Sequence, residues 1–159
     1  MKGVILYKED TYYTYLKSIF EAINNRQKEY NWLISDCVCY PANINYEILM
    51  NRDYTWISGE DLTNMINDEN FQIIWGVFSG FKKNIKFNDV MEYSLPYADG
   101  YSGFWKDEVS IQHPLSDIEM VAWDSSLTLF ISKDENLVNK VLSNFAKAED
   151  LGEYNKQFL

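Results

Sequence analysis

Hydrophobic and polar positions between residues 118 and 145 follow first the period of a strand and then that of a helix. Residues 118–123 and 127–132 each alternate with a period of two, and Asp124-Ser125-Ser126 between them favours a tight turn. The two runs are therefore predicted to pair antiparallel as a hairpin. Both hairpin faces carry apolar side chains, which predicts a central place in a sheet, with helices on one face and Trp123 and Phe130 partly covering the other.

A helix is predicted to follow this hairpin over residues 135–148. Asp134 can accept a hydrogen bond from a free amide of the first turn, and apolar side chains from Leu137 to Phe145 recur at intervals of three and four. Gly152 is expected to mark its end.

The earlier part of the chain shows the same two periods. Helical spacing predicts a helix over residues 12–29, introduced by Asp10 or Thr11, and a shorter one over residues 59–68, where Ser58 and Asp61 can form a reciprocal cap. Strands are predicted at residues 4–7, 31–40 and 71–78, with Gly76 marking a bulge or a close approach. Residues 46–50 fit a strand or a short helix equally well.

These elements predict one α+β domain over residues 1–159, with a predominantly antiparallel sheet and about three helices packed mainly on one face. The chain has 159 residues, 47% of them hydrophobic, and no Pro-, Gly- or Ser-rich linker divides it. Its first apolar run is too short for a signal peptide or a membrane span, so we expect a cytoplasmic protein.

The charge balance narrows the choice of partners. Lys and Arg number 14 and Asp and Glu number 24, for a formal net charge of −10. Such a charge repels phosphate backbones and anionic lipids, so nucleic-acid and membrane binding are not expected. Two interpretations stay open: the charge serves solubility alone, or it steers the protein toward a basic partner.

Few chemical groups are available for catalysis or metal binding. The single histidine, His113, is either a surface or half-buried ring or a lone general base, and no nucleophile motif accompanies it. Cys37 and Cys39 are expected to be reduced thiols in the core, because their spacing on one strand suits a disulfide poorly. Gly100-Tyr101-Ser102-Gly103 resembles the start of a nucleophile elbow, but that motif needs a glycine two positions after the serine, where this chain has Phe104. No phosphate-binding glycine loop occurs in the sequence. No metal or cofactor is therefore expected.

The irregular segment 88–117 is the region from which we predict binding residues. It is dense in aromatic side chains, which serve as anchors in interfaces when they are exposed. The alternative is that the segment folds over the sheet and buries them. The candidate binding residues are Tyr97, Asp99, Tyr101, Phe104, Trp105 and His113.

The order of these segments resembles domain of unknown function 2691, an uncharacterised bacterial family. The resemblance rests on Asn31-Trp32-Leu33-Ile34, on residues 57–62 and 71–75, and above all on Trp123-Asp124-Ser125-Ser126 with the helix that follows. It supports the α+β fold and implies no activity and no catalytic residues.

Our leading hypothesis is a non-catalytic protein-binding module, similar in profile to an immunity protein, whose acidic and aromatic surface engages a basic protein. The alternative is a small-molecule binder or enzyme with a pocket between the sheet and the 88–117 loop, lined by Trp75, Tyr97, Tyr101, Trp105 and Trp123. A third is a homo-oligomeric structural protein, and the oligomeric state stays open.

Overall fold

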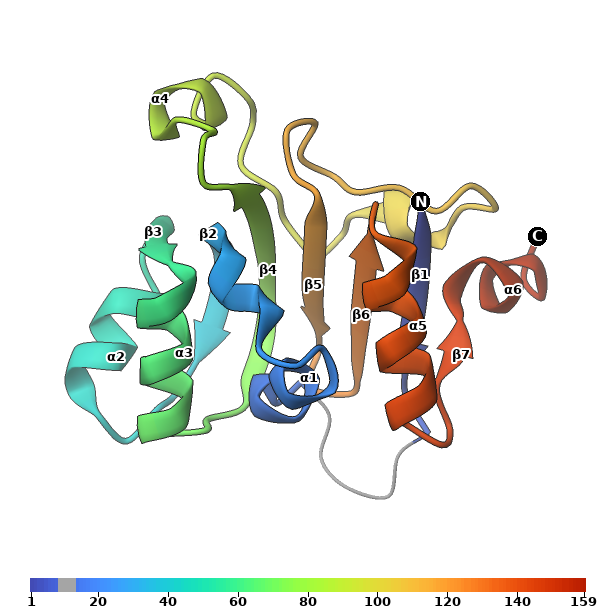
Figure 1. Ribbon diagram of the computed structural model, residues 1–159, viewed down its shortest axis with the longest axis horizontal. Coiled ribbons are helices and arrows are strands. Elements are labelled where there is room, and N and C mark those ends of the chain that lie inside the picture. Colours follow the sequence, from blue (N-terminus) through green and yellow to red (C-terminus); the bar gives the residue numbers. More distant parts are fainter. Residues whose placement is uncertain (9–13) are drawn as a thin grey trace.

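The computed structural model describes residues 1–8 and 14–159 and contains a seven-stranded open sheet (Figure 1). Every strand pairs antiparallel with its neighbours, in the order β3-β2-β4-β5-β6-β1-β7. The strands are β1 Lys2–Leu6, β2 Tyr30–Cys39, β3 Tyr54–Ser58, β4 Ile73–Lys82, β5 Ile118–Trp123, β6 Leu127–Ser132 and β7 Glu149–Asp150. This architecture confirms the predicted α+β fold class and places the β5–β6 hairpin at the centre of the sheet.

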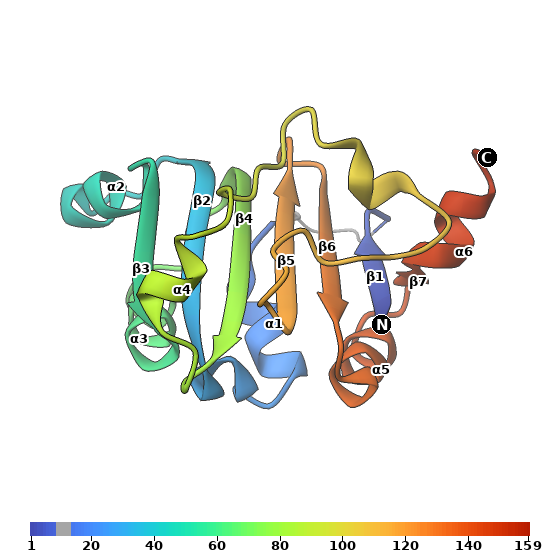
Figure 2. The ribbon, with the colours of Figure 1, turned by 90° about the horizontal axis from the view of Figure 1, so that it is seen from above.

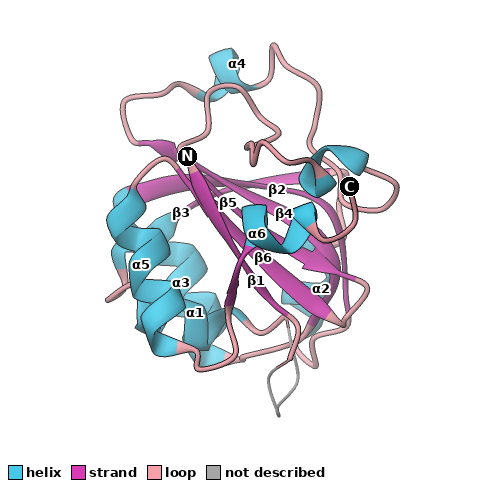
Figure 3. Ribbon diagram, turned by 90° about the vertical axis from the view of Figure 1, so that its right-hand side faces the viewer, coloured by secondary structure: helices cyan, strands magenta, loops and turns pink. Residues whose placement is uncertain are grey.

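Three of the helices cover one face of the sheet, as predicted (Figure 3). They are α1 Leu16–Ala22, α3 Gly59–Asp68 and α5 Glu135–Asn144. We call this the helix face. The remaining helical elements are α2 Ile44–Met50, α4 Phe87–Val90, α6 Leu151–Lys156 and the 3-10 turns η1 Arg26–Glu29 and η2 Ser102–Trp105. Helix α2 settles the ambiguity at residues 46–50 in favour of a helix.

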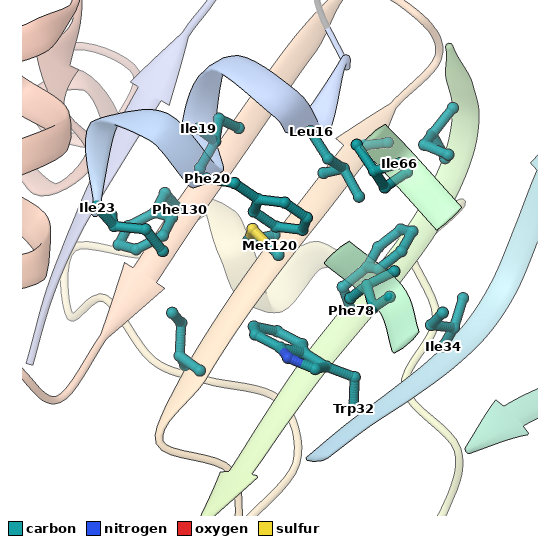
Figure 4. Close-up of a cluster of buried hydrophobic side chains, with 14 of the residues drawn as sticks. Leu16, Ile19, Phe20, Ile23, Trp32, Ile34, Ile66, Phe78, Met120 and Phe130 are labelled. Atoms are coloured by element: carbon teal, nitrogen blue, oxygen red, sulfur yellow. The ribbon is translucent and has the colours of Figure 1, made fainter. Parts of the chain in front are cut away.

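The main core lies between these helices and the sheet (Figure 4). Side chains of α1, among them Phe20, lie over Phe78, Met120 and Phe130, which come from three neighbouring strands. Each such buried side chain contributes about 1.5–3 kcal/mol of transfer free energy. Phe130 therefore belongs to the helix face, and the prediction that it covers the opposite face with Trp123 is wrong; the period of two places these two residues on different faces.

The opposite face of the sheet is covered by the chain between β4 and β5 (Figure 2). We call residues 83–117 the cover segment. Its Ala98 and Phe104 pack against Val121 and Leu129, and its Val90 packs with a second cluster that includes Phe81. The irregular segment thus forms the second layer over the sheet, as one of the two sequence interpretations proposed.

Two predicted helices are shorter than their hydrophobic pattern indicated. The start proposed for the first, at residue 12 with Asp10 or Thr11 as cap, lies outside the described residues; its α-helical part ends at Ala22, not at residue 29. Asn24 and Asn25 take left-handed conformations (φ 56° and 59°), and the Asn25 amide donates to the Phe20 carbonyl at 2.8 Å, which closes the helix. Asparagine tolerates this conformation better than most residues, so it ends helices.

The last predicted helix ends at Asn144 instead of residue 148, because Phe145 is extended (φ −121°, ψ 109°). The chain then forms β7 and a new helix, α6, across the position where Gly152 was expected to end the earlier helix. Asp150 caps α6 by accepting the Glu153 amide at 3.0 Å. The start was predicted correctly, since Asp134 accepts the Asn136 amide at 2.9 Å.

Strand β3 was not predicted, and β4 runs beyond the predicted end at residue 78 to Lys82. The bulge expected at Gly76 lies on the facing strand: β2 places Asp36 and Cys37 opposite that single glycine. Asp36 is left-handed there (φ 51°). The hairpin turn also has two left-handed residues, Asp124 and Ser125 (φ 49° and 58°), as a type I′ turn requires.

Candidate binding surface

His113 is a structural part of the cover segment. The ring is buried; its Nδ1 accepts the Leu115 amide at 3.1 Å, so Nε2 carries the proton and donates to the Val90 carbonyl at 2.9 Å. Burial lowers the pKa of the imidazole, and the hydrogen bond to Val90 only partly opposes this. With both nitrogens bonded to backbone groups, the ring holds two parts of the segment together and offers no free nitrogen for general-base chemistry.

A buried side chain of the sheet, Glu119 on β5, holds the cover segment against the sheet. Its two oxygens lie 3.1 and 3.3 Å from the Gln112 amide nitrogen, and the Ser79 hydroxyl donates to it at 3.4 Å. Burial raises the pKa of the Glu119 carboxyl to about 7, against the opposing effect of these hydrogen bonds. The side chain of Gln112 continues the network by bonding the Tyr97 amide and carbonyl at 3.0 and 2.8 Å.

Asp36, the left-handed residue of the β2 bulge, anchors the segment at another point. Its carboxylate accepts the Ala98 amide at 2.8 Å and the Asp99 amide at 3.3 Å. Next to it, the Ser35 hydroxyl donates to the Pro96 carbonyl at 2.7 Å. Asp99, one of the predicted binding residues, thus contributes its backbone to the fold and leaves its side chain in solvent. Sequence reasoning did not find Asp36.

The aromatic candidates pack mainly against one another. Tyr101 contacts Tyr97 and Phe104 edge to face, with ring centroids 5.3 and 4.7 Å apart. Phe104 is buried, Tyr101 and Trp105 are half-buried, and Tyr97 is 46% exposed. Burial also raises the pKa of the Tyr101 phenol. Of the predicted set, Tyr97 therefore offers the largest exposed aromatic surface.

The tryptophans proposed to line a pocket form a second group of touching rings. Trp123 lies between Trp75 and Trp105, with centroid distances of 5.0 and 5.1 Å and edge-to-face geometry. Trp105 also approaches Tyr154 of α6 at 6.4 Å. Ring contacts of this kind bring favourable packing of about 0.5–1.5 kcal/mol each. The rings pack directly against one another, so these tryptophans extend the apolar layer that covers the sheet.

The two cysteines lie in the core as free thiols, as predicted. Their sulfur atoms are 4.0 Å apart, and the contact with Cys39, together with burial, raises the pKa of the Cys37 thiol. Among residues 1–8 and 14–159, no group of three or more His, Cys, Asp or Glu side chains could hold a metal ion.

A groove of about 600 Å³ opens at the other end of the molecule, beside edge strand β3. Its walls are α2 and α3. The Tyr46 hydroxyl of α2 donates to Asp68 of α3 at 2.6 Å across it, and the Thr55 hydroxyl of β3 bonds the Leu49 carbonyl of α2. Its lining combines apolar and acidic side chains: Tyr46, Leu49, Thr55, Trp56, Ile57, Asp61, Asn64, Met65 and Asp68.

Negative charge is concentrated in the part of the sequence that contains the groove-forming elements. Residues 36–69 contain seven carboxylates and one arginine, a net charge of −6 out of the −10 of the whole chain. The carboxylates are Asp36, Glu47, Asp53, Glu60, Asp61, Asp68 and Glu69, and the arginine is Arg52. Two carboxylates, Asp61 and Asp68, line the groove directly, whereas no lysine or arginine does.

Exposed apolar side chains adjoin the same acidic region. Ile44 and Ile48, one helical turn apart on α2, are 60% and 57% exposed, and Tyr40, shortly before them, is 71% exposed. Exposed apolar groups beside charged ones are typical of a protein-binding surface. We call the groove and these flanking side chains the acidic groove.

The comparisons with known proteins add a family but no activity. A family model described as a protein of unknown function (DUF2691) matches residues 1–97. No curated protein and no solved structure matches the chain. The match confirms the family resemblance but ends before the β5–β6 hairpin, which had been considered its strongest part. It includes all the groove-lining residues. In the part of the chain that the structure describes, no helix is long and apolar enough to cross a membrane.

Proposed function

This chain belongs to the DUF2691 family, for which no function is known, and we propose that it is a non-catalytic, cytoplasmic protein-binding module whose acidic groove engages a basic partner protein. The observation that carries the proposal is that residues 36–69 contain a groove lined by two carboxylates, exposed apolar side chains and most of the net negative charge of the chain. Complementary charge speeds association and selects among partners, while apolar contacts supply most of the affinity.

The chemistry of the polar groups supports binding in preference to catalysis. Both nitrogens of His113 bond backbone groups, and Glu119, whose pKa is raised, is fully enclosed beneath the cover segment. A general acid or base needs contact with substrate, directly or through one water. The acidic groove instead presents carboxylates with no basic side chain in its lining, which favours attraction of a cation.

An immunity protein against a basic toxin is one class with this profile. A toxin gene immediately beside the gene for this chain would favour that assignment. The analogy rests on charge, a property that unrelated folds share.

The experiment compares two double variants with the same net charge. The groove variant carries Asp61→Asn and Asp68→Asn, and the control carries Glu135→Gln and Glu153→Gln on α5 and α6, away from the groove. Each protein is immobilised, exposed to lysate of its own organism and eluted with rising salt. We expect a basic protein to be retained by the wild type and the control and lost from the groove variant. Equal retention by both variants would contradict a role for the groove.

A further inference from the structure

We propose, on the basis of the proposed function, that the segment of the partner bound in the acidic groove is an extended basic peptide that adds as a new strand to the free edge of β3. The position of the groove along the sheet edge, the charge of its walls and the geometry of strands all favour this mode of recognition.

The lining of the groove indicates that it follows the strand edge. Thr55, Trp56 and Ile57 are consecutive residues of β3, and all three line it. Successive side chains of a strand point to opposite faces of the sheet. The clusters agree with this rule, since Ile57 packs with the helix-face core and Trp56 with Phe81 on the opposite face. A groove that touches all three residues therefore borders the backbone between them.

The backbone at this edge has one strand partner within the described part of the chain. β3 pairs with β2 from Ser58 opposite Asn31 to Tyr54 opposite Ser35, and it stands at the end of the sheet order. Edge strands offer amide and carbonyl groups to another chain, and added peptides use them for main-chain hydrogen bonds. Figure 1 shows α2 outermost on this side of the molecule, so the peptide would enter between α2 and α3.

The charge of the region selects the occupant. A second copy of this chain, with a net charge of −10 and its own Asp61 and Asp68 beside the same edge, would be repelled. A basic strand would be attracted. Asp61 and Asp68 are two helical turns apart on α3, about 10 Å along its axis, which an extended peptide spans in roughly three residues. Two Lys or Arg side chains on a short peptide can therefore reach both carboxylates.

The two faces beside β3 determine the pattern of the peptide. Basic side chains that point to the helix face would reach Asp61 and Asp68 and pack their aliphatic stems against Ile57, while the alternate side chains would lie beside Trp56 on the opposite face. Alternation of apolar and basic residues satisfies both, because alternate side chains of a strand share a face. The structure thus points to an extended segment that alternates aliphatic residues with lysine or arginine.

The experiment uses a short fluorescein-labelled peptide that alternates valine and lysine, together with two versions N-methylated on opposite sets of alternate residues. Binding to the full chain is followed by fluorescence anisotropy. An added strand hydrogen-bonds to β3 through the amides of alternate residues, while the other amides point away from β3. We therefore expect one methylated peptide to bind at least tenfold more weakly than the parent, and the other to bind like the parent. We also expect the Asp61→Asn, Asp68→Asn variant to weaken binding of the parent peptide about tenfold, unlike the Glu135→Gln, Glu153→Gln control.

The outcomes separate this inference from the proposed function. Equal affinity of all three peptides, with binding still weakened in the groove variant, would overturn strand addition and leave a basic-partner groove standing. Binding that is equal in the groove variant and the control would overturn the groove as the basic site, and with it both proposals. Absence of binding by the parent peptide at low salt would overturn strand addition, and the proposed function would then be judged by the retention experiment alone.

Discussion

Replacement of Glu119 by glutamine should stabilise the protein at neutral and alkaline pH and leave it unaffected or slightly weaker in acid. Glu119 is fully buried, and burial raises the pKa of its carboxyl from the ordinary value of 4.5 to about 7. Glutamine has the same shape and keeps one oxygen to accept the Gln112 amide. Its amide group can donate to the Ser79 hydroxyl, which now donates to the carboxylate. The substitution therefore removes mainly the buried charge.

The size and sign of the effect follow from proton binding. Because the folded state holds the proton of Glu119 more tightly than the unfolded state does, this carboxyl stabilises the fold fully below about pH 4.5 and loses that contribution as the pH rises to about 7. The interval between the two pKa values corresponds to about 3 kcal/mol. This value already includes the hydrogen bonds that the carboxylate accepts, because they lower the pKa that burial raises. The variant should therefore exceed the wild type by about 2–3 kcal/mol above neutrality.

Urea denaturation of both proteins across this pH range measures the difference. The comparison between proteins is essential because His113, whose pKa is lowered by burial, destabilises both of them as it becomes protonated in acid. The free energy of unfolding of the variant minus that of the wild type should grow as the pH rises from about 4.5 to about 7 and then level off. A difference that stays constant with pH would refute the assignment of a raised pKa to Glu119.

Three further predictions concern the bulge, the start of α3 and the thiols. Asp36→Ala should lower the free energy of unfolding by about 2–3 kcal/mol and expose the cover segment to limited proteolysis, because it removes the carboxylate oxygen that accepts two backbone amides at a left-handed position. Asp36→Asn, which keeps an acceptor oxygen and tolerates that conformation, should cost less than half as much, and equal losses would contradict this role. Gly59→Ala should lower the free energy of unfolding by about 1–3 kcal/mol, measured by thermal unfolding. The new methyl would lie 2.2 Å from the Gln27 carbonyl oxygen, and this clash outweighs the gain of about 1 kcal/mol in helix propensity. A stabilised variant would show that the contact relaxes freely. Cys37 and Cys39 should resist iodoacetamide in the native protein and react once it is unfolded, as mass spectrometry would show, and rapid native labelling of either thiol would contradict its burial.

The elements predicted well from the sequence are those with local signals at both ends. Helix α3 has Ser58, whose hydroxyl accepts the Asp61 amide at 3.1 Å, immediately before a strong helical period. The β5–β6 hairpin has two alternating runs joined by a turn that its residues favour. In both cases the residues that determine the element lie within it, so neighbouring sequence is sufficient.

The elements that were missed depend on distant partners. β3 is five residues long, and its strand conformation is supported by pairing with β2. The two-residue β7 likewise pairs with β1, at the opposite end of the sequence. Pairing of this kind is not encoded in a short window of sequence. The same dependence explains why the hydrophobic stripe after Glu135 appeared to continue beyond Asn144.

The exposure of the predicted binding residues could not be read from the sequence, since aromatic density alone does not distinguish a packed layer from an exposed one. Phe104 and His113 are buried parts of the cover segment, and Trp105 is half-buried against Trp123. The acidic groove could not be assembled from sequence because it needs α2, β3 and α3 in contact. One signal was nevertheless present: the seven carboxylates and single arginine of residues 36–69.

The most direct test of a basic-partner groove is an NMR titration of the ¹⁵N-labelled protein with the valine–lysine peptide. We expect the largest chemical-shift changes in the amides of Thr55, Trp56 and Ile57 and along α3 between Asp61 and Asp68, with the changes reversed by added salt. Changes confined to residues 97–105 of the cover segment would contradict this account and would return the binding surface to the exposed aromatic side chains there.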